Sequence, residues 1–292
     1  MTPRFDAYCR RKESAALAAA IPGYTTREET AAGLVRIGTD WSRDLFDGEF
    51  LRSPGPAIED VPVTSLVFVQ SRDGNTVAPD PSALGGGHTD LHLVYEGLSR
   101  VDADAVLAGS ATARSKELVF SVWHPDLVAL RLARGRHRHP AQVVLTNRGD
   151  LRFDDSLLFQ EPELRVFVIT RSGSVGEIRR RVSGRGWIEV LDAGERVSLT
   201  RALRDLRARG IGVVSAVGGS QTATALLHER LVSDIYLTTS AIAAGEPDTP
   251  YYQGPPLPLR RVLLKEGRGV ETGVRFEHFL VGSYRRGQRE RV

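Results

Sequence analysis

The chain has 292 residues and a net charge of +3. Of these residues 41% are hydrophobic and 26% are charged, as in a globular protein with a sizeable core. Basic residues are scattered among acidic ones and form no stripe with aromatic residues, so nucleic acid is not an expected partner. The single cysteine, Cys9, excludes an internal disulfide and a zinc site built on paired cysteines. No apolar stretch is long enough to span a membrane, and residues 1–14 lack the apolar stretch of a secretion signal. We therefore expect a cytoplasmic protein with no membrane partner.

The first 60 residues differ in pattern from the rest of the chain. Ser14–Ile21 predicts an alanine-rich helix that ends at Pro22, residues 41–51 predict a second short helix, and a segment with three prolines follows. We interpret residues 1–60 as a helical extension that covers a sheet edge or a partner subunit. An α/β domain is expected over residues 61–284, followed by a basic tail over residues 285–292.

From residue 61 onward the pattern alternates between strands and helices. The expected helices begin at Thr89, at Val175 and at Ser198, with Thr89 and Ser198 as caps. Apolar runs predict strands at residues 65–70, 105–108, 143–146, 166–170, 187–191, 213–217 and 235–237. Two last strands, at 261–265 and 274–281, have no helix between them, which predicts an antiparallel hairpin at one edge. Together these elements indicate a three-layer α/β fold with a mixed, mostly parallel sheet.

A glycine turn carries the most specific functional signal. Gly218 and Gly219 lie between the apolar run 213–217 and a helical pattern that begins near Ser220. Glycines let the backbone approach a ligand, and the free amides of a helix start favour an anion. The side chains of Ser220, Gln221 and Thr222 add donors. Neither a complete G-x-G-x-x-G nor a Walker motif is present, and a tight turn without a ligand is the alternative.

Three other turns follow predicted strands or precede a predicted helix. Residues 71–74 (SRDG) and 109–112 (GSAT) each follow a strand, where α/β proteins place ligands. Each is equally compatible with an ordinary turn. Residues 85–87 are three glycines, which predict either a loop that closes over a ligand or a plain connector. No metal is expected, because the close histidines His137 and His139 lie in an arginine-rich loop.

These pieces occur together and in a familiar order. The chain has S-x-D-G at residues 71–74, D-A-V-x-x-G-x-x-T at 104–112 shortly after Arg100, and a proline before V-V-L at 143–145. It then has the glycine pair after Val217 and L-x-x-D-x-x-L at 231–237. This arrangement resembles the reductase domain of the bifunctional riboflavin-biosynthesis deaminase-reductases, which has a dihydrofolate-reductase-like fold. The resemblance covers about residues 61–282.

The resemblance implies a reductase that takes hydride from NADPH, with a ribosylaminopyrimidine phosphate as the family's substrate. It implies substrate contacts at Arg100 and Val217, and a homodimer paired through sheet edges, for which Trp123, Leu127 and Leu130 are candidate contacts. The cofactor contacts that we expect are Val69, Thr112, Gly218, Gly219, Ser220, Gln221, Thr222 and Ala223.

We place the nicotinamide ring beside Asp73, Arg100 and Lys116, and we expect catalytic roles for Asp73 and Lys116. Lys116 would bind an anionic substrate group, or donate a proton if burial lowers its pKa. The alternatives without a catalytic or binding role are that Asp73 only forms a turn, that Arg100 only caps a helix, and that Lys116 is a solvated surface residue. No residue decides between NADPH and NADH, although Arg114 and Arg148 are candidates for a 2′-phosphate contact.

The chain departs from the family at two carboxylates. The family's acid before the glycine pair is Val217 here, and the acid after Thr112 is Lys116. The zinc motif of the deaminase half is absent, since a chain with one cysteine cannot supply P-C-x-x-C. Two alternatives therefore stay open beside the pyrimidine reductase. One is reduction of a different heterocycle such as a pterin, and the other is a catalytically silent relative that binds a nucleotide or pterin as a sensor or assembly partner.

Overall fold

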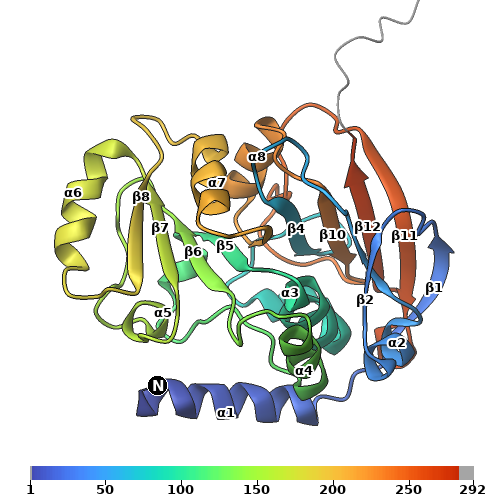
Figure 1. Ribbon diagram of the computed structural model, residues 1–292. Helices are drawn as coiled ribbons and strands as arrows, with labels where there is room; N and C mark the ends of the chain where they lie inside the picture. Colours follow the sequence, from blue (N-terminus) through green and yellow to red (C-terminus); the bar gives the residue numbers. More distant parts are fainter. Residues whose placement is uncertain (1, 283–292) are drawn as a thin grey trace, which may run out of the picture.

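The computed structural model describes residues 2–282, so the predicted basic tail of residues 285–292 lies outside the described residues. A 10-stranded sheet forms the centre, in the order β1-β11-β12-β10-β4-β9-β5-β6-β7-β8 (Figure 1). Its strands are β1 (Tyr24–Glu29), β4 (Val63–Gln70), β5 (Ala105–Gly109), β6 (Ala141–Leu145), β7 (Val166–Thr170), β8 (Ile188–Asp192), β9 (Val213–Val217), β10 (Asp234–Thr239), β11 (Leu259–Gly267) and β12 (Arg275–Val281). A separate small sheet pairs β2 (Val35–Ile37) with β3 (Phe50–Arg52).

The sheet is mixed as the sequence predicts. All strands from β10 to β8 in the sheet order run parallel to their neighbours, whereas β12, β11 and β1 add antiparallel pairs at one edge. The predicted strands at 166–170 and 213–217 have the observed bounds of β7 and β9, and the C-terminal hairpin is β11 with β12. Apolar runs predict these strands well, because a parallel strand covered on both faces is apolar at nearly every position.

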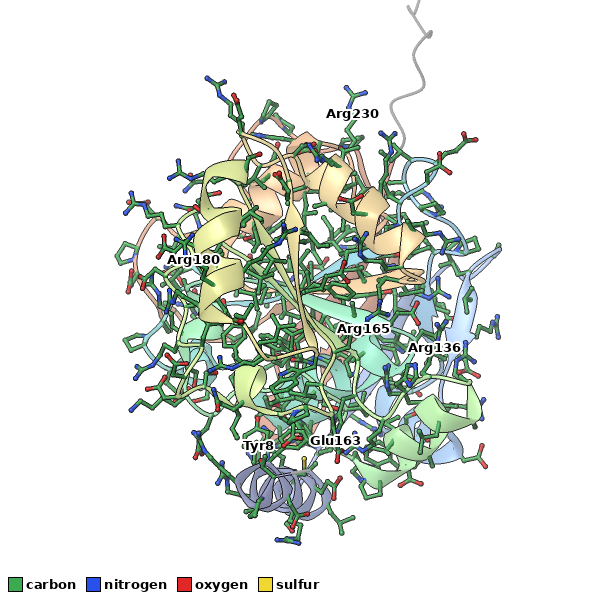
Figure 2. All side chains as sticks on the ribbon, turned by 60° about the vertical axis from the view of Figure 1, so that its left-hand side comes forward. Tyr8, Arg136, Glu163, Arg165, Arg180 and Arg230 are labelled. Carbon is green, nitrogen blue, oxygen red and sulfur yellow. The ribbon has the colours of Figure 1, made fainter. Side chains whose placement is uncertain are left out.

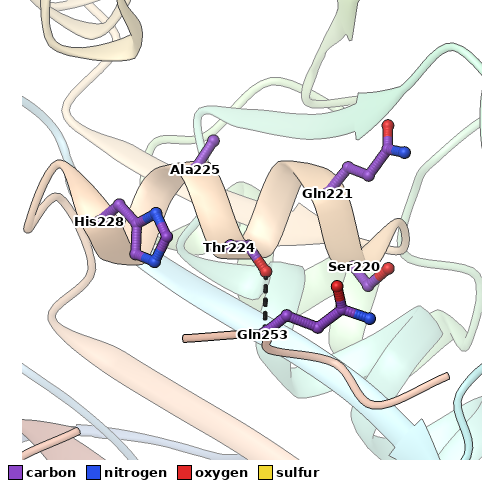
Figure 3. Close-up of a pocket in the computed structure, with 6 residues that line it drawn as sticks. All are labelled: Ser220, Gln221, Thr224, Ala225, His228 and Gln253. Carbon is purple, nitrogen blue, oxygen red and sulfur yellow. Dashed lines mark hydrogen bonds between the residues drawn. The ribbon is translucent and has the colours of Figure 1, made fainter. Parts of the chain in front are cut away.

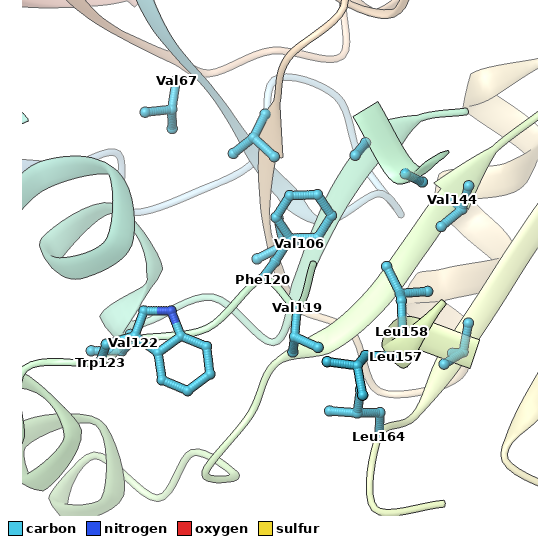
Figure 4. Packing of buried hydrophobic residues seen from close by; sticks show 14 of the residues in the cluster. Val67, Val106, Val119, Phe120, Val122, Trp123, Val144, Leu157, Leu158 and Leu164 are labelled. Carbon is cyan, nitrogen blue, oxygen red and sulfur yellow. The ribbon is translucent and has the colours of Figure 1, made fainter. Parts of the chain in front are cut away.

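Helices cover both faces of the sheet and complete three layers (Figure 1). Strand side chains alternate between the faces, so Val106 and Val144 pack with one set of helices and Leu107 and Val143 with the other. Figure 4 shows part of the first core, where Phe120, Trp123 and Leu157 belong to the same cluster as Val106 and Val144. The α-helices are α1 (Pro3–Ala18), α2 (Asp40–Phe46), α3 (Ser99–Val101), α4 (Pro125–Ala133), α5 (Leu157–Gln160), α6 (Ser172–Arg181), α7 (Leu199–Ala208) and α8 (Ser220–His228). The other helical segments are the 3₁₀ helices η1 (Pro81–Leu84), η3 (Thr112–Arg114) and η4 (Gly269–Glu271) and the π-helix η2 (Thr89–Leu98).

The N-terminal region differs from its prediction. The first helix, α1, runs over Pro3–Ala18 instead of Ser14–Ile21, because Thr2 caps it and a proline occupies its first position. Its side chains Phe5 and Tyr8 are buried in the core. The predicted second helix at 41–51 divides into α2 and strand β3, and β1 pairs with β11 at the edge of the main sheet. Within residues 2–282, no helix has the length and apolar character needed to cross a membrane.

The helix predicted to begin at Thr89 forms, but it is not capped as expected. The carboxylate of Glu271 accepts the backbone N–H groups of His88 (2.6 Å) and Thr89 (3.2 Å), while the Thr89 hydroxyl accepts the N–H of Gly23. A carboxylate at a helix N-terminus satisfies its free amides and opposes the positive end of its dipole. The cap was missed because Glu271 lies 182 residues away in sequence.

Two residues proposed as dimer contacts are inside the protomer. Trp123 and Leu127 are both 0% exposed, so neither is available to a partner subunit. The ring of Trp123 meets Tyr8 of α1 edge-on, with 5.6 Å between centroids, and the guanidinium of Arg138 lies 5.5 Å from the Trp123 centroid. Helix α1 therefore covers the tryptophan that the sequence analysis assigned to an interface.

Candidate active site

A groove crosses the sheet where its parallel strands end at their carboxyl termini. Its volume is about 840 Å³. The ends of β5 and β6 form its floor, and the first turn of α8 and the loop before α7 form its walls. The lining residues are Val77, Gly109, Ser110, Ala111, Thr112, Leu145, Thr146, Asn147, Arg148, Arg171, Glu195, Arg196, Val197, Leu199, Gly219, Ser220, Gln221, Thr222 and Ala225. The carboxyl edge of a parallel sheet is where α/β folds bind ligands.

The glycine turn opens into this groove. Gly218 and Gly219 have φ values of +67° and +83°, which only glycine adopts without strain. A Cβ atom on Gly218 would lie 2.9 Å from the Thr112 hydroxyl oxygen, so the two turns approach closely at this point. No side chain caps helix α8, which begins at Ser220. Its first amides therefore remain available to an anion in the groove.

A smaller pocket of about 270 Å³ adjoins the groove along α8 (Figure 3). It shares Ser220, Gln221 and Ala225 with the groove. The hydroxyl of Thr224 on its wall accepts the backbone N–H of Gln253 at 3.1 Å. This bond fastens the long segment before β11 to the helix that carries the glycine turn.

The structure brings five of the predicted cofactor contacts together in the groove. They are Thr112, Gly219, Ser220, Gln221 and Thr222. Gly218 shapes the turn but does not line the groove. Ala223 and Val217 are each 1% exposed and belong to the two cores on opposite faces of the sheet.

Two further predicted residues lie away from the groove lining. Val69 is half-buried near the end of β4, where a Cβ on Gly86 would come within 2.7 Å of its Cγ2 atom. Arg100 is 1% exposed. Its Nη1 donates to the carbonyl of Ser121 (3.0 Å), and its guanidinium lies over the ring of Tyr95, 4.3 Å from the centroid.

The two residues expected to be catalytic are held by neighbouring polar groups. The side chain of Lys116 is 58% exposed and lies 3.5 Å from a carboxylate oxygen of Asp155. The burial that the proton-donor hypothesis requires is therefore absent. Asp73 accepts hydrogen bonds from the Ser71 hydroxyl (2.5 Å) and the Asn75 amide (3.0 Å). The Ser71 bond, above all, lowers the pKa of Asp73, which keeps its carboxyl ionised and holds the turn.

The sequence analysis missed a buried acid beside Val69. Asp90 lies in the first turn of η2 and accepts a hydrogen bond from the Thr238 hydroxyl (2.5 Å). Thr238 pairs with Val69 across β10 and β4, and a Cβ on Gly86 would approach Asp90 Oδ2 to 3.1 Å. The acid is thus at the carboxyl edge of the sheet. Burial raises the pKa of Asp90 to about 7, and Glu271 adds to this rise.

The far end of the groove is formed by residues 145–148, Arg171, residues 195–197 and Leu199, and of these the sequence analysis named only Arg148, as a candidate 2′-phosphate contact. The strand ends themselves were predicted. The signal available was that carboxyl ends of parallel strands meet at one edge. The order of the strands decides which ends are neighbours, and the local sequence pattern does not predict that order.

Among residues 2–282, no group of three or more His, Cys, Asp or Glu side chains is placed to hold a metal ion.

The fold and groove define a class. The mostly parallel sheet with antiparallel strands at one edge is a dihydrofolate-reductase-like fold, as the sequence predicts. The sequence matches the RibD C-terminal domain family over residues 63–274, and the chain belongs to this family. It is an oxidoreductase of the reductase type.

Three relatives illustrate the relationship. A 2,5-diamino-6-ribosylamino-4(3H)-pyrimidinone 5′-phosphate reductase from Archaeoglobus fulgidus is 26% identical over 164 residues, which are 55% of this chain and 71% of that protein. The solved structure of a pyrimidine reductase-like protein from Corynebacterium diphtheriae has a TM-score of 0.63 at 22% identity and covers 76% of this chain and 92% of that one. A deaminase/reductase structure from Thermotoga maritima has a TM-score of 0.55 at 19% identity, covering 77% of this chain and 58% of that one.

Proposed function

We propose that the protein is an NADPH-dependent reductase of a pyrimidine- or pterin-like heterocycle, similar in activity to the pyrimidinone phosphate reductase of Archaeoglobus fulgidus. The observation that carries the proposal is the open glycine turn on a groove across the strand ends. Family membership supplies the reaction class. A riboflavin-pathway intermediate is the first substrate to test.

The groove residues fit a dinucleotide. The amides from Gly219 to Thr222 face the groove without a side-chain cap, which suits a pyrophosphate. The hydroxyls of Ser110 and Thr112 lie beside this turn and suit phosphate or ribose oxygens. When bound, the nicotinamide ring supplies the hydride; this chain supplies alignment and exclusion of water.

Reduction by hydride also needs a proton, and Asp90 is the group that we propose to hold it. It lies at the carboxyl edge of β4 and β10, beside Val69, which the family resemblance assigns to the cofactor. With its pKa raised to about 7, Asp90 carries a proton through much of the neutral range. Lys116 and Asp73 do not offer this: the lysine is exposed, and the aspartate is held ionised.

The function is tested by titrating the purified full chain with NADPH and following nicotinamide fluorescence. Oxidation of NADPH is then followed by the loss of its nicotinamide absorbance, with ribosylaminopyrimidine phosphates, pterins and dihydrofolate as substrates. Turnover with one of these classes supports the proposal and names the substrate. Absence of binding at roughly millimolar NADPH (an affinity weaker than about 4 kcal/mol) refutes it. Tight binding with no oxidation of any substrate instead supports the catalytically silent relative.

The homodimer implied by the family stays a prediction. We propose that any partner surface lies outside the buried Trp123 and Leu127. The mass in solution at micromolar concentration checks it, and a monomeric mass would contradict it.

A further inference from the structure

The charged residues of the groove gather at the end away from the glycine turn. They are three arginines, Arg148, Arg171 and Arg196, and one acid, Glu195. Arg148 follows β6, Arg171 follows β7 directly, and Arg196 lies between β8 and α7. Because the sheet order is β9-β5-β6-β7-β8, these arginines lie progressively farther from the turn at the end of β9.

The three arginines also share a lack of acidic partners. Basic side chains occur over much of the surface (Figure 2), and many arginines in residues 2–282 form ion pairs, including Arg114 with Asp150 at 2.8 Å. None of the three groove arginines forms an ion pair within the described part of the chain. Arg171 makes one long hydrogen bond, from Nε to the Ser174 hydroxyl at 3.4 Å. Three positive charges that converge on one concavity with a single acid, Glu195, raise its electrostatic potential and attract an anion.

Their spacing from the turn suits the second anionic group of a dinucleotide. Neighbouring strands lie roughly 5 Å apart, so the end of β6 is about 10 Å and the end of β7 about 14 Å from the end of β9. A dinucleotide with its pyrophosphate at the glycine turn and its adenosine half along the groove would bring the adenosine ribose toward the ends of β6 and β7. In NADPH that ribose carries a phosphate monoester at its 2′ position, which NADH lacks. Guanidinium groups bind phosphate through paired, charge-assisted hydrogen bonds.

We propose that Arg148, Arg171 and Arg196 bind the 2′-phosphate and select NADP(H) over NAD(H). This inference rests on the proposed function, because it presumes that the groove binds a nicotinamide dinucleotide. Glu195 lines the same end and opposes the anion in part. Arg114, the other candidate from the sequence, is paired with Asp150 and does not line the groove.

The test compares ligands that differ only in the 2′-phosphate. The full chain is titrated with NADPH and NADH by nicotinamide fluorescence, and with 2′,5′-ADP and 5′-AMP by calorimetry, so that no readout depends on turnover. We expect the phosphorylated ligand of each pair to bind about 10- to 100-fold more tightly, since charged hydrogen bonds are worth a tenfold change or more. This preference is expected to weaken as salt is raised, because the site is open to solvent.

Variants then assign the preference to residues. Replacing the three arginines together with glutamine is expected to reduce the NADPH/NADH ratio of affinities to within about threefold of unity, with NADH binding little changed. Arg114→Gln is the matched control and is expected to keep the wild-type ratio. Glu195→Gln is expected to raise NADPH affinity about two- to threefold by removing the opposing charge. Because the three arginines are exposed and have no ion-pair partner in residues 2–282, the triple variant is expected to fold, which its circular dichroism and melting temperature check.

The outcomes separate this inference from the proposed function. Equal wild-type affinities for NADPH and NADH, or a triple variant with an undiminished preference, overturn the assignment while leaving the reductase intact. If neither nucleotide binds, the proposed function fails and the inference fails with it.

Discussion

The close approach of the two turns at Gly218 gives a prediction with a magnitude. An alanine there would adopt a φ of +67° and place its Cβ 2.9 Å from the Thr112 hydroxyl oxygen. The left-handed conformation costs a non-glycine residue roughly 1–2 kcal/mol, and crowding at a packed site costs roughly 1–3 kcal/mol more. Gly218→Ala is therefore expected to lower the free energy of unfolding by about 2–5 kcal/mol and to weaken NADPH binding.

Gly219→Ala is the matched control for backbone strain. Its φ is +83°, but the nearest atom that its Cβ would meet, the Thr222 hydroxyl oxygen, is 3.7 Å away. Its ψ of 99° lies outside the left-handed helical region, so Gly219→Ala is expected to cost backbone strain of roughly 1–3 kcal/mol without crowding. Adding Thr112→Ala to Gly218→Ala removes the crowding atoms and is expected to recover about 1–3 kcal/mol, measured as the interaction energy of a double-mutant cycle.

The assay is urea unfolding, followed by circular dichroism, of wild type, Gly218→Ala, Gly219→Ala, Thr112→Ala and the double variant, with NADPH titration of each folded protein. An interaction energy near zero in the cycle of Gly218→Ala with Thr112→Ala would refute the close approach of the two turns. Unchanged NADPH affinity in both glycine variants would refute the turn as the pyrophosphate site, since a displaced backbone could not keep its amides aimed at the same anion.

Three further predictions concern buried ionisable groups. Asp90→Asn is expected to lower turnover and to remove a limb near pH 7 from the rate profile, and a profile that keeps this limb contradicts a proton on Asp90. Because its raised pKa makes the folded state bind the extra proton, wild-type stability is expected to fall as pH rises from about 4 to about 7, and the variant should lack this slope. Lys265 is 0% exposed, and burial lowers its pKa to about 8. The unfolded state therefore binds more protons between pH 8 and 10.5, and stability is expected to rise over that range by up to about 3 kcal/mol. Lys265→Met is expected to abolish this rise, and an identical pH dependence in both proteins would contradict a buried amine. Glu271→Ala leaves the amides at the start of η2 without their acceptor, and a loss of about 1–2 kcal/mol is expected in urea unfolding, whereas a loss confined to within error would show that water replaces the cap.

Much of the sheet could be predicted because its strands are buried on both faces. The runs 166–170 and 213–217 are apolar along their whole length and end at polar or glycine residues, so period and bounds agree. Helix α7 could also be predicted from the sequence, because Ser198 caps it by accepting the N–H of Arg201 and its leucines share one face. Helix α1 was not, because its buried side chains alternate with many charged residues and its extent depends on packing against Trp123.

Of the residues expected from the resemblance, Thr112 and residues 219–222 line the groove, whereas Val217, Ala223 and Arg100 do not. Residues 219–222 line the groove and no side chain caps their helix, so the glycine pair is enough to predict this end of the groove whatever side chains follow it. Val217 was assigned by position alone. It is the last residue of β9, its side chain points into the core beside Val67, and Ala216 points to the opposite face. The alternation of side chains along a strand shows that Val217 and Ala216 point to opposite faces of the sheet. Which of the two faces is covered by helices, and which is open to a ligand, depends on the tertiary packing.

The end of the groove that we assign to the 2′-phosphate illustrates a different limit. Arg148, Arg171 and Arg196 are spread over 49 positions of sequence, and each follows a strand that a reader can find. Taken separately, each is an arginine in a loop after a strand, which by itself does not indicate a binding site. They become neighbours because β6, β7 and β8 stand side by side and parallel, which aligns their carboxyl ends. Under this proposal, specificity for the cofactor depends on the order of the strands as well as on the three arginines. A search for motifs along the chain would not find the site, because the arginines are close only in the folded protein.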